Sequence, residues 1–311
     1  MADATHGLGG LKYDPAKRTR APEWNVFGAL VLIVVIFEIL NRMQGGSFLF
    51  NMRDNVDAIF NQQRLDIMIL QVAIIGVIAI GVTQVIIIGG IDLSSGSLVG
   101  ATAMIVMSFA QTAMVNGNPN PKAIFGDWAM DLPVIVPIAV GLACGLIAGL
   151  VNGLLIAYTR IPPFIATLGM MVSARGIARW WSNGQPVSFP TETYGGLANG
   201  DLLGALSFGL VSWQGQNPAV IFVILAVLFH LIMKYTLYGK RSYAIGSNEA
   251  AARMSGINVD RHKVLVYTMA GLLAAVAAIL LTSKNLTAQA GMGMMYELDA
   301  IAMAVIGGVS L

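Results

Sequence analysis

The chain is dominated by long apolar stretches that carry almost no charge. Between Asp66 and Lys122 the only charged residue is Asp92. The 311 residues are 56% hydrophobic and 11% charged, against about 25% charged in ordinary soluble domains. About 20 mostly apolar residues cross a bilayer as a helix, and helices satisfy their own backbone hydrogen bonds in lipid. The sequence therefore predicts an all-α fold, a polytopic transmembrane helical bundle.

Eight segments are apolar and long enough to be interpreted as spans. They divide the chain into an N-terminal tail, residues 1–24, and a transmembrane domain, residues 25–311. The net charge of +2 is too small to favour nucleic acid as a partner, and the single Cys144 rules out a disulfide within the chain. The predicted spans are residues 25–41, 65–88, 97–115, 133–158, 164–181, 218–235, 264–283 and 298–311, the last being cut off by the chain end.

Lys and Arg in the loops predict the orientation, because cytoplasmic loops are enriched in both. The tail is basic, and residues 182–217 contain neither Lys nor Arg. Residues 234–263 contain six of them. Eight alternating spans with a cytoplasmic N-terminus place the basic loop inside and the uncharged one outside. We therefore expect a multi-pass membrane protein with its N-terminus in the cytoplasm.

Asp92 is a carboxylate in a segment that otherwise resembles membrane. A charge at the centre of a bilayer costs about 2.5 to 3.5 kcal/mol on insertion scales, so its presence needs a reason. One interpretation is contact with a transported solute or ion. The other, which the topology favours, is that Asp92 caps the N-terminus of the third span, where free N–H groups and the helix dipole attract an anion.

Other polar residues are further candidates for a substrate pathway. With Asp92, the candidate set is Ser94, Asn152, Thr167 and Arg175. Arg175 and Arg179 lie four residues apart, on one helix face, where they either reach lipid headgroups or line an outer vestibule. We leave both interpretations open.

The fourth predicted span has glycines at a strict four-residue spacing. On a helix this spacing forms one smooth ridge that lets another backbone approach closely. We expect the ridge to pack against another helix of the same subunit rather than to line the pathway. The four residues are Gly141, Gly145, Gly149 and Gly153.

The inner loop, residues 236–263, predicts a short helix on the cytoplasmic face. Ser247 is a suitable N-cap, Glu249 suits the first turn, and Gly256 suits the left-handed residue after the last turn. The alternative is a solvated turn. A capped, alanine-rich helix outside the membrane needs a surface to pack on, which indicates a cytoplasmic partner.

The sequence shows no catalytic set and no metal-ligand spacing. Only His6, His230 and His262 occur, far apart in the sequence, and there is no phosphate-binding loop of the Gly-x-x-x-x-Gly-Lys-Ser/Thr type. We therefore expect that the chain is not an enzyme and binds no cofactor or metal. If ATP drives its function, another chain binds it.

Three motifs in fixed order give the chain a family resemblance. They are Gly-Gly-Ile-Asp-Leu-Ser at 89–94, Ile-Pro-Pro-Phe-Ile-Ala-Thr-Leu-Gly at 161–169, and Gly-Ser-Asn-Glu-Ala-Ala-Ala-Arg-Met-Ser-Gly-Ile-Asn at 246–258. Together they resemble the permease subunits of bacterial ABC importers for monosaccharides, of the ribose, xylose, galactose and inositol types. The resemblance covers nearly the whole chain.

The resemblance implies an assembly. Two permease copies form the pathway, a cytoplasmic ABC ATPase binds ATP and Mg, and a periplasmic sugar-binding protein delivers the solute. The family usually has about ten spans, so we expect that the chain ends early and lacks the final pair. The short inner helix resembles a coupling helix, which would place six residues against the ATPase: Ser247, Asn248, Glu249, Ala250, Arg253 and Gly256.

Other functions remain possible at this stage. A branched-chain amino acid permease of the related type would carry a zwitterion and favour more charged groups in the pathway. An ion-coupled secondary transporter would use Asp92 as a proton or sodium site. The predicted inner helix argues against this function because it indicates a cytoplasmic partner. A structural membrane subunit would leave Asp92 unexplained. The leading hypothesis is import of a neutral sugar or cyclitol.

Overall fold

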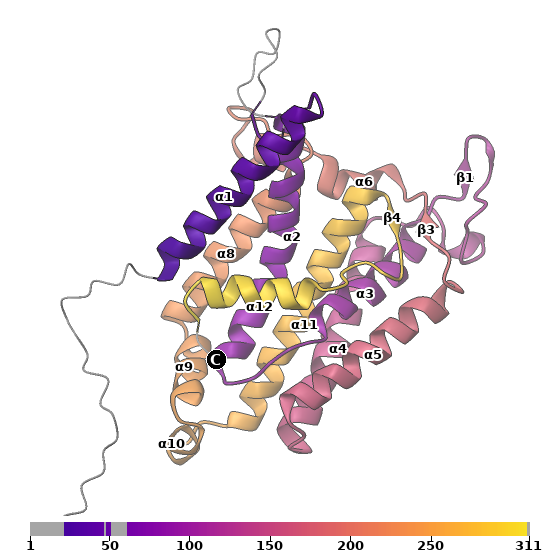
Figure 1. Ribbon diagram of the computed structural model, residues 1–311. Coiled ribbons are helices and arrows are strands. Elements are labelled where there is room, and N and C mark those ends of the chain that lie inside the picture. The colour runs from indigo at the N-terminus through magenta and orange to yellow at the C-terminus, as the bar shows by residue number, and fades with distance from the viewer. Residues whose placement is uncertain (1–21, 47, 51–60, 310–311) are drawn as a thin grey trace, which may run out of the picture. The chain divides into compact units, whose positions relative to one another are not determined.

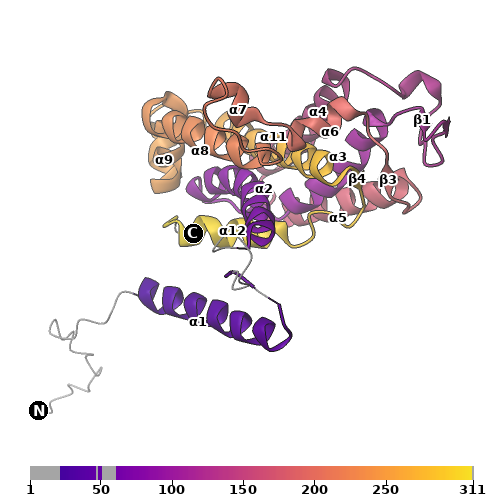
Figure 2. The ribbon, with the colours of Figure 1, turned by 90° about the horizontal axis from the view of Figure 1, so that it is seen from above.

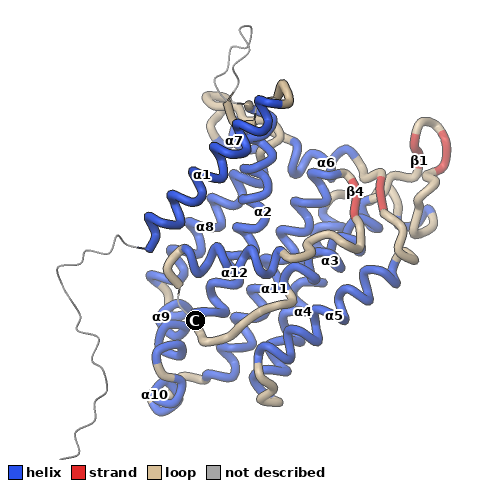
Figure 3. Tube along the Cα trace, viewed as in Figure 1, coloured by secondary structure: helices blue, strands red, loops and turns tan. Residues whose placement is uncertain are grey.

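The protein is helical throughout the part that the structure describes. A computed structural model describes residues 22–46, 48–50 and 61–309 (Figures 1 and 3). The predicted all-α class is confirmed, since each of the strands seen there is only two residues long. The predicted tail, residues 1–24, lies almost entirely outside the described residues. The chain divides into two compact units, residues 1–67 and 68–311.

The first unit contains α1 (Pro22–Met43) and the start of α2 (Gln62–Ile87). The predicted span 25–41 is therefore helical. Glu38 anchors the segment that follows α1, because its carboxylate accepts hydrogen bonds from the Leu49 N–H at 2.7 Å and from Arg42 at 3.0 Å. The Phe37 and Phe48 rings stack with centroids 5.6 Å apart.

The second unit contains the rest of α2 and all later elements. Its short strands gather at one end, and α10 lies at the other (Figures 1 and 3). The α-helices that follow α2 are α3 (Ser95–Ala110), α4 (Ile135–Tyr158), α5 (Pro163–Trp181), α6 (Glu192–Asn199), α7 (Leu202–Leu206), α8 (Asn217–Tyr235), α9 (Leu237–Ser247), α10 (Glu249–Met254), α11 (Val259–Asn285) and α12 (Tyr296–Ile306). A 3-10 turn, η1 (Asp127–Ala129), and the strands β1 (Met114–Val115), β2 (Asn118–Pro119), β3 (Val187–Ser188) and β4 (Thr287–Ala288) complete it.

Among the described residues, four helices, α2, α4, α8 and α11, are long and apolar enough to cross a membrane. They coincide with four of the eight predicted spans, and α11 is the most buried of them. Its Ala-rich and Gly-containing face lets neighbouring helices approach closely. In Figures 1 and 2, α9 lies beside the end of α8, and in Figure 1 it lies between α8 and α10.

The third predicted span is shorter than expected. The prediction extended it to residue 115, but α3 ends at Ala110. The helix ends at Gln111 because the side chain of this residue hydrogen-bonds to two loops. Its amide donates to the Ser188 carbonyl at 2.9 Å and to the Lys122 carbonyl at 2.7 Å. After it, β1 and β2 form a hairpin around Asn116 and Gly117, both of which have positive φ.

The eighth predicted span is a short helix instead. The prediction ran from residue 298 to 311, whereas α12 ends at Ile306, and residues 310–311 lie outside the described residues. Eleven residues at about 1.5 Å each are too short to cross a core of about 30 Å. In Figure 1, α12 runs crosswise to the direction of α11.

Gly-Gly pairs end both α2 and α12. Gly89 has φ +77° and Gly308 has φ +97°, and in each case the next residue donates its N–H to a carbonyl five positions earlier. This is the Schellman pattern, in which glycine takes the left-handed position at little steric cost. The two similar sequences at 88–91 and 306–309 therefore share a helix-ending role.

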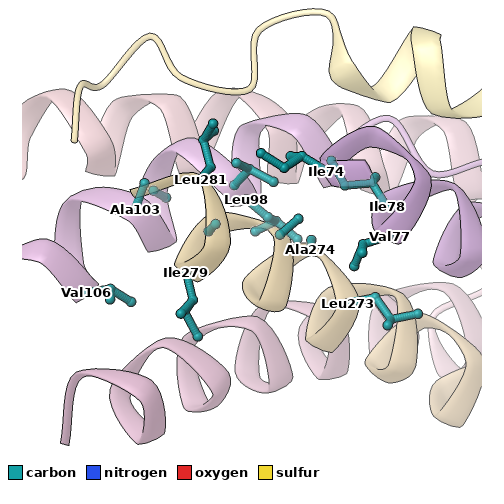
Figure 4. Packing of buried hydrophobic residues seen from close by; sticks show 14 of the residues in the cluster. Ile74, Val77, Ile78, Leu98, Ala103, Val106, Leu273, Ala274, Ile279 and Leu281 are labelled. Atoms are coloured by element: carbon teal, nitrogen blue, oxygen red, sulfur yellow. The ribbon is translucent and has the colours of Figure 1, made fainter. Parts of the chain in front are cut away.

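The core lies between α2, α3, α4 and α11. Figure 4 shows Ile74 of α2 beside Leu98 of α3, in a buried cluster that also contains Ile78 of α2 and Leu273 of α11. On the α4 side the contact is between backbones. A side chain at Gly149 would meet the Tyr267 carbonyl and Thr268 Cα, and Gly141, Gly145 and Gly153 also face α11 or its side chains.

Candidate functional site

Asp92 lies in the turn between α2 and α3 and is only 2% exposed. One carboxylate oxygen accepts two hydrogen bonds from Ser94, from its N–H at 2.8 Å and from its Oγ at 2.6 Å. This is an Asx-turn, in which an Asp side chain bonds the backbone two residues further on. The carboxylate thus bonds the backbone just before α3, because Ser94 is the N-cap residue.

The turn brings four of the five candidate pathway residues together. The Asn152 amide of α4 donates to Ser94 Oγ at 2.9 Å, and Thr167 Oγ1 of α5 lies 3.4 Å from the Ile91 carbonyl. Tyr267 of α11 also reaches that carbonyl, at 3.5 Å. The sequence pattern did not single out Tyr267, since an aromatic in an apolar helix is usually part of the core.

Arg175, the fifth candidate, lies apart from this cluster. It is eight residues along α5 from Thr167, which is about 12 Å at 1.5 Å per residue. Its guanidinium donates to the backbone carbonyls of Met292 at 2.7 Å and Ala290 at 3.2 Å. It therefore holds the loop before α12, a role that neither the headgroup nor the vestibule interpretation foresaw.

Glu297 is the buried acid that sequence reasoning missed. It lies in the first turn of α12, is 7% exposed, and its Oε2 has no hydrogen-bond partner among the described residues. The Glu297 carboxylate packs directly against Gly96 of α3, where a Cβ would collide with it. The sequence signal for this residue was an acidic side chain directly before an apolar run. The eighth predicted span began one residue later, at residue 298, and so left Glu297 out.

Several buried polar atoms in this region have unused hydrogen-bonding capacity. Among the described residues, Asn152 Oδ1 and the hydroxyls of Ser95 and Ser97 are buried without partners. Buried polar groups normally have partners, so such atoms need an explanation, for example a bound water or solute. The unpartnered groups are an amide, hydroxyls and a carboxylate, which suit a hydroxylated solute. The described residues contain no cluster of side chains that could bind a metal ion.

The predicted inner helix is present as α10, with one correction to its cap. The N-cap is Asn248, whose side chain accepts from the Ala251 N–H at 3.0 Å, and not Ser247, which ends α9. Asn248 is the N-cap because its backbone is extended, as this position requires. Gly256 has φ +83°, and it closes the helix in a Schellman pattern with Ile257 donating to the Ala252 carbonyl.

Four charged side chains join α10 to the start of α11. Arg253 makes a two-pronged ion pair with Asp260, with one contact at 2.9 Å, and contacts Glu249 at 3.1 Å. Lys263 contacts the other Glu249 oxygen at 2.8 Å. The hydrogen bond from Lys263 holds the pKa of the Glu249 carboxyl below its usual range, and Arg253 lowers this pKa further, while partial burial opposes both.

The helix before α10 is fixed to the bundle by polar contacts. Tyr238 donates to Gln84 of α2 at 2.6 Å, and Ser242 lies 2.8 Å from the His262 ring of α11. Gly246 packs against the Ile87 carbonyl so closely that a side chain would not fit. Movement of α10 would therefore be transmitted to α2, which leads into the Asp92 turn, and to α11, whose Tyr267 reaches the Ile91 carbonyl in that turn.

Acidification is expected to loosen α10 from α11. Because the pKa of Glu249 is lowered in the folded state, its stabilising effect is present above the unfolded value of 4.5 and is lost as the pH falls through the lower folded value. Hydrogen exchange of the α10 amides, corrected for its intrinsic pH dependence, should show protection at pH 7. This protection should decline as the pH falls from 4.5 through the lower, folded-state pKa of Glu249. The decline should be smaller in Glu249→Gln, and equal protection across the range would contradict this role.

Comparison with known proteins gives the family. A family described as "Branched-chain amino acid transport system / permease component" matches residues 64–311, and the chain belongs to it. A permease component is not itself an enzyme, and the family together with the long apolar helices makes this a multi-pass membrane protein. The resemblance to import permeases is thereby confirmed.

Among individual relatives, the ribose import permease protein of Bacillus subtilis (strain 168) is 38% identical over 286 residues, which is 92% of this chain and 76% of the relative. The galactose/methyl galactoside import permease protein of Haemophilus influenzae is 35% identical and covers 75% of this chain and 67% of the relative. The xylose transport system permease protein of Escherichia coli (strain K12) is 32% identical and covers 78% of this chain and 70% of the relative. No solved structure matches the chain.

Proposed function

We propose that this chain is the transmembrane permease subunit of an ATP-driven ABC importer that carries a sugar or a cyclitol across the bacterial inner membrane. The observation that carries the proposal is the similarity to relatives named as ribose, galactose and xylose permeases over 75% to 92% of the chain. The family description also names branched-chain amino acids, but the named relatives favour a sugar.

The polar groups near Asp92 support a neutral cargo. Ser94 already occupies one carboxylate oxygen of Asp92, and the side chains that hydrogen-bond to this turn from α4 and α5 are the uncharged Asn152 and Thr167. A zwitterionic amino acid would need a cation for its carboxylate, and the hydrogen-bonded groups of the turn include none. We therefore propose that Asp92, Ser94, Asn152 and Thr167 border the pathway, and that Arg175 shapes it through the loop before α12.

The inner segment supports energy input from another chain. We assign α10 as the coupling helix, with Ser247, Asn248, Glu249, Ala250, Arg253 and Gly256 at or beside a cytoplasmic ABC ATPase that binds ATP and Mg. A second permease copy completes the pathway, and a periplasmic sugar-binding protein delivers the solute. The N-terminus is then cytoplasmic, which agrees with the basic residues of the tail and of residues 234–263.

Uptake into membrane vesicles tests the function. Vesicles that contain the permease and its ATPase should accumulate labelled sugar only with internal ATP and an added binding protein. A panel of ribose, xylose, galactose, inositol and leucine would define the cargo class. Accumulation driven by an ion gradient without ATP, or accumulation of leucine alone, would reject the proposal.

A further inference from the structure

A pocket of about 520 Å³ lies between α10, the start of α11 and the turn that joins α4 to α5. We call it the α10 pocket. Its apolar lining comes from Ile156, Ala157, Ile161, Pro162 and Pro163, and its charged lining from Arg160, Glu249, Arg253, Asp260 and Lys263. An apolar lining with a few charged groups suits a side chain that has an apolar stem and a charged end.

The charges in the α10 pocket leave one cation free. Glu249 is shared by Arg253 and Lys263, and Asp260 is held by both prongs of Arg253. Two carboxylates and two cations thus neutralise one another. Arg160 is exposed and, among the residues that the structure describes, forms no ion pair and no side-chain hydrogen bond. The lining therefore has a net charge of +1, located at Arg160.

The backbone at Arg160 makes a purely structural role a poor explanation. Arg160 directly follows the C-cap residue of α4 and has φ +57°, in the left-handed region. Glycine adopts this conformation without the steric penalty that a side chain brings, and it is the usual residue at this position. An arginine here strains the backbone, and among the described residues its guanidinium has an electrostatic attraction to Asp260 but neither an ion pair nor a hydrogen bond to offset the strain. A group outside the chain explains its presence better.

We propose that the α10 pocket receives an acidic side chain of the ATPase subunit, with its carboxylate on Arg160 and its apolar stem against Pro162 and Ile161. The identity of the partner rests on the proposed function, and it extends the contact with the ATPase from α10 to the α4–α5 turn. One net positive charge matches one carboxylate. A phosphate group would carry more negative charge and would approach the Glu249 and Asp260 carboxylates, which disfavours a lipid headgroup.

This assignment has a structural consequence. The α10 pocket is lined by the ends of α4, α5 and α11, and these three helices also carry Asn152, Thr167 and Tyr267 of the Asp92 cluster. A side chain inserted into the pocket would therefore contact the helices that border the proposed pathway directly, in addition to α10.

Arg160→Gly is the decisive variant, because it removes the guanidinium and relieves the left-handed backbone at the same time. We expect a Tm at or above that of the wild-type permease, together with about tenfold weaker binding of the purified ATPase subunit, as for a charge pair at a protein interface. Arg160→Lys should retain most of the affinity. Arg261→Gln, which removes an exposed cation nearby that does not line the pocket, should bind like the wild type.

Cross-linking identifies the partner group. The amine introduced by Arg160→Lys can be joined to a carboxylate by a carbodiimide, which forms an amide with loss of water. Peptide mapping should then find residue 160 linked to an Asp or Glu of the ATPase, and no such link in the wild type, whose guanidinium does not react. Equal ATPase binding by wild type and Arg160→Gly, or a link to no acidic residue, would overturn the pocket assignment and leave the importer function intact. If the ATPase does not bind the wild type at all, both proposals fail.

Discussion

Replacing Gly145 with alanine is expected to disrupt the packing of α4 on α11 and to lower the stability of the folded permease clearly. The added Cβ would overlap the Gly271 carbonyl oxygen and would lie 2.6 Å from the Ala275 Cβ. The obstacle is mainly backbone, so no rotamer change can relieve it. We expect a loss of about 3 kcal/mol, the upper end of the cost of overpacking a core, against a total stability of about 5 to 15 kcal/mol.

The matched control is Gly169→Ala on α5. Nothing lies within 4 Å of a Cβ built at Gly169, so the same substitution should be neutral or stabilise the helix, by up to about 1 kcal/mol. Thermal unfolding in detergent, followed by the loss of the monodisperse peak in size-exclusion chromatography, measures both variants. A Gly145→Ala protein with the Tm of the wild type would mean that the two helices are not in backbone contact.

Helices could be predicted from this sequence because the apolar runs are long and the helix ends carry local signals. Pro163 begins α5 one residue before the predicted span 164–181, at a position where proline suits a helix start, and Gly256 closes α10 in the left-handed conformation. Such signals operate within a few residues, so they can be recognised without knowledge of the tertiary structure. The existence of α2, α4, α8 and α11 follows from the same kind of evidence.

The errors arise where distant contacts decide the structure. Nothing near Gln111 shows that its side chain will bond loops that include Ser188, 77 residues away, and so end α3. The choice between Ser247 and Asn248 as N-cap depends on where α9 ends, which its contacts with α2 and α11 determine. The sequence marks Arg175 only as a candidate for the pathway or for lipid headgroups, and it does not mark Glu297 at all. Their roles depend on the loop before α12 folding back onto α3.

Replacing Asp92 with alanine is expected to have the second large effect, through the fold. Asp92 Oδ1 accepts from both the N–H and the hydroxyl of Ser94, and the alanine variant leaves both buried groups without this acceptor. Each unsatisfied buried group costs about 1 to 3 kcal/mol, so we expect a loss of about 2 to 6 kcal/mol for the two. Asp299→Ala, which removes an exposed acid of α12, should change stability by no more than about 0.5 kcal/mol.

Asp92→Asn separates the structural role of this residue from direct contact with the solute. The amide oxygen can take the place of Oδ1 and accept both hydrogen bonds, so the turn before α3 is kept while the charge is removed. Because the carboxylate serves the backbone at the start of α3, we expect this variant to keep a near-native Tm and most of the ATP-dependent uptake. Uptake per folded molecule in vesicles is the measurement, and the alanine variant should lose uptake in proportion to its loss of folded protein. A stable Asp92→Asn permease that transports nothing would show that the charge itself acts on the solute.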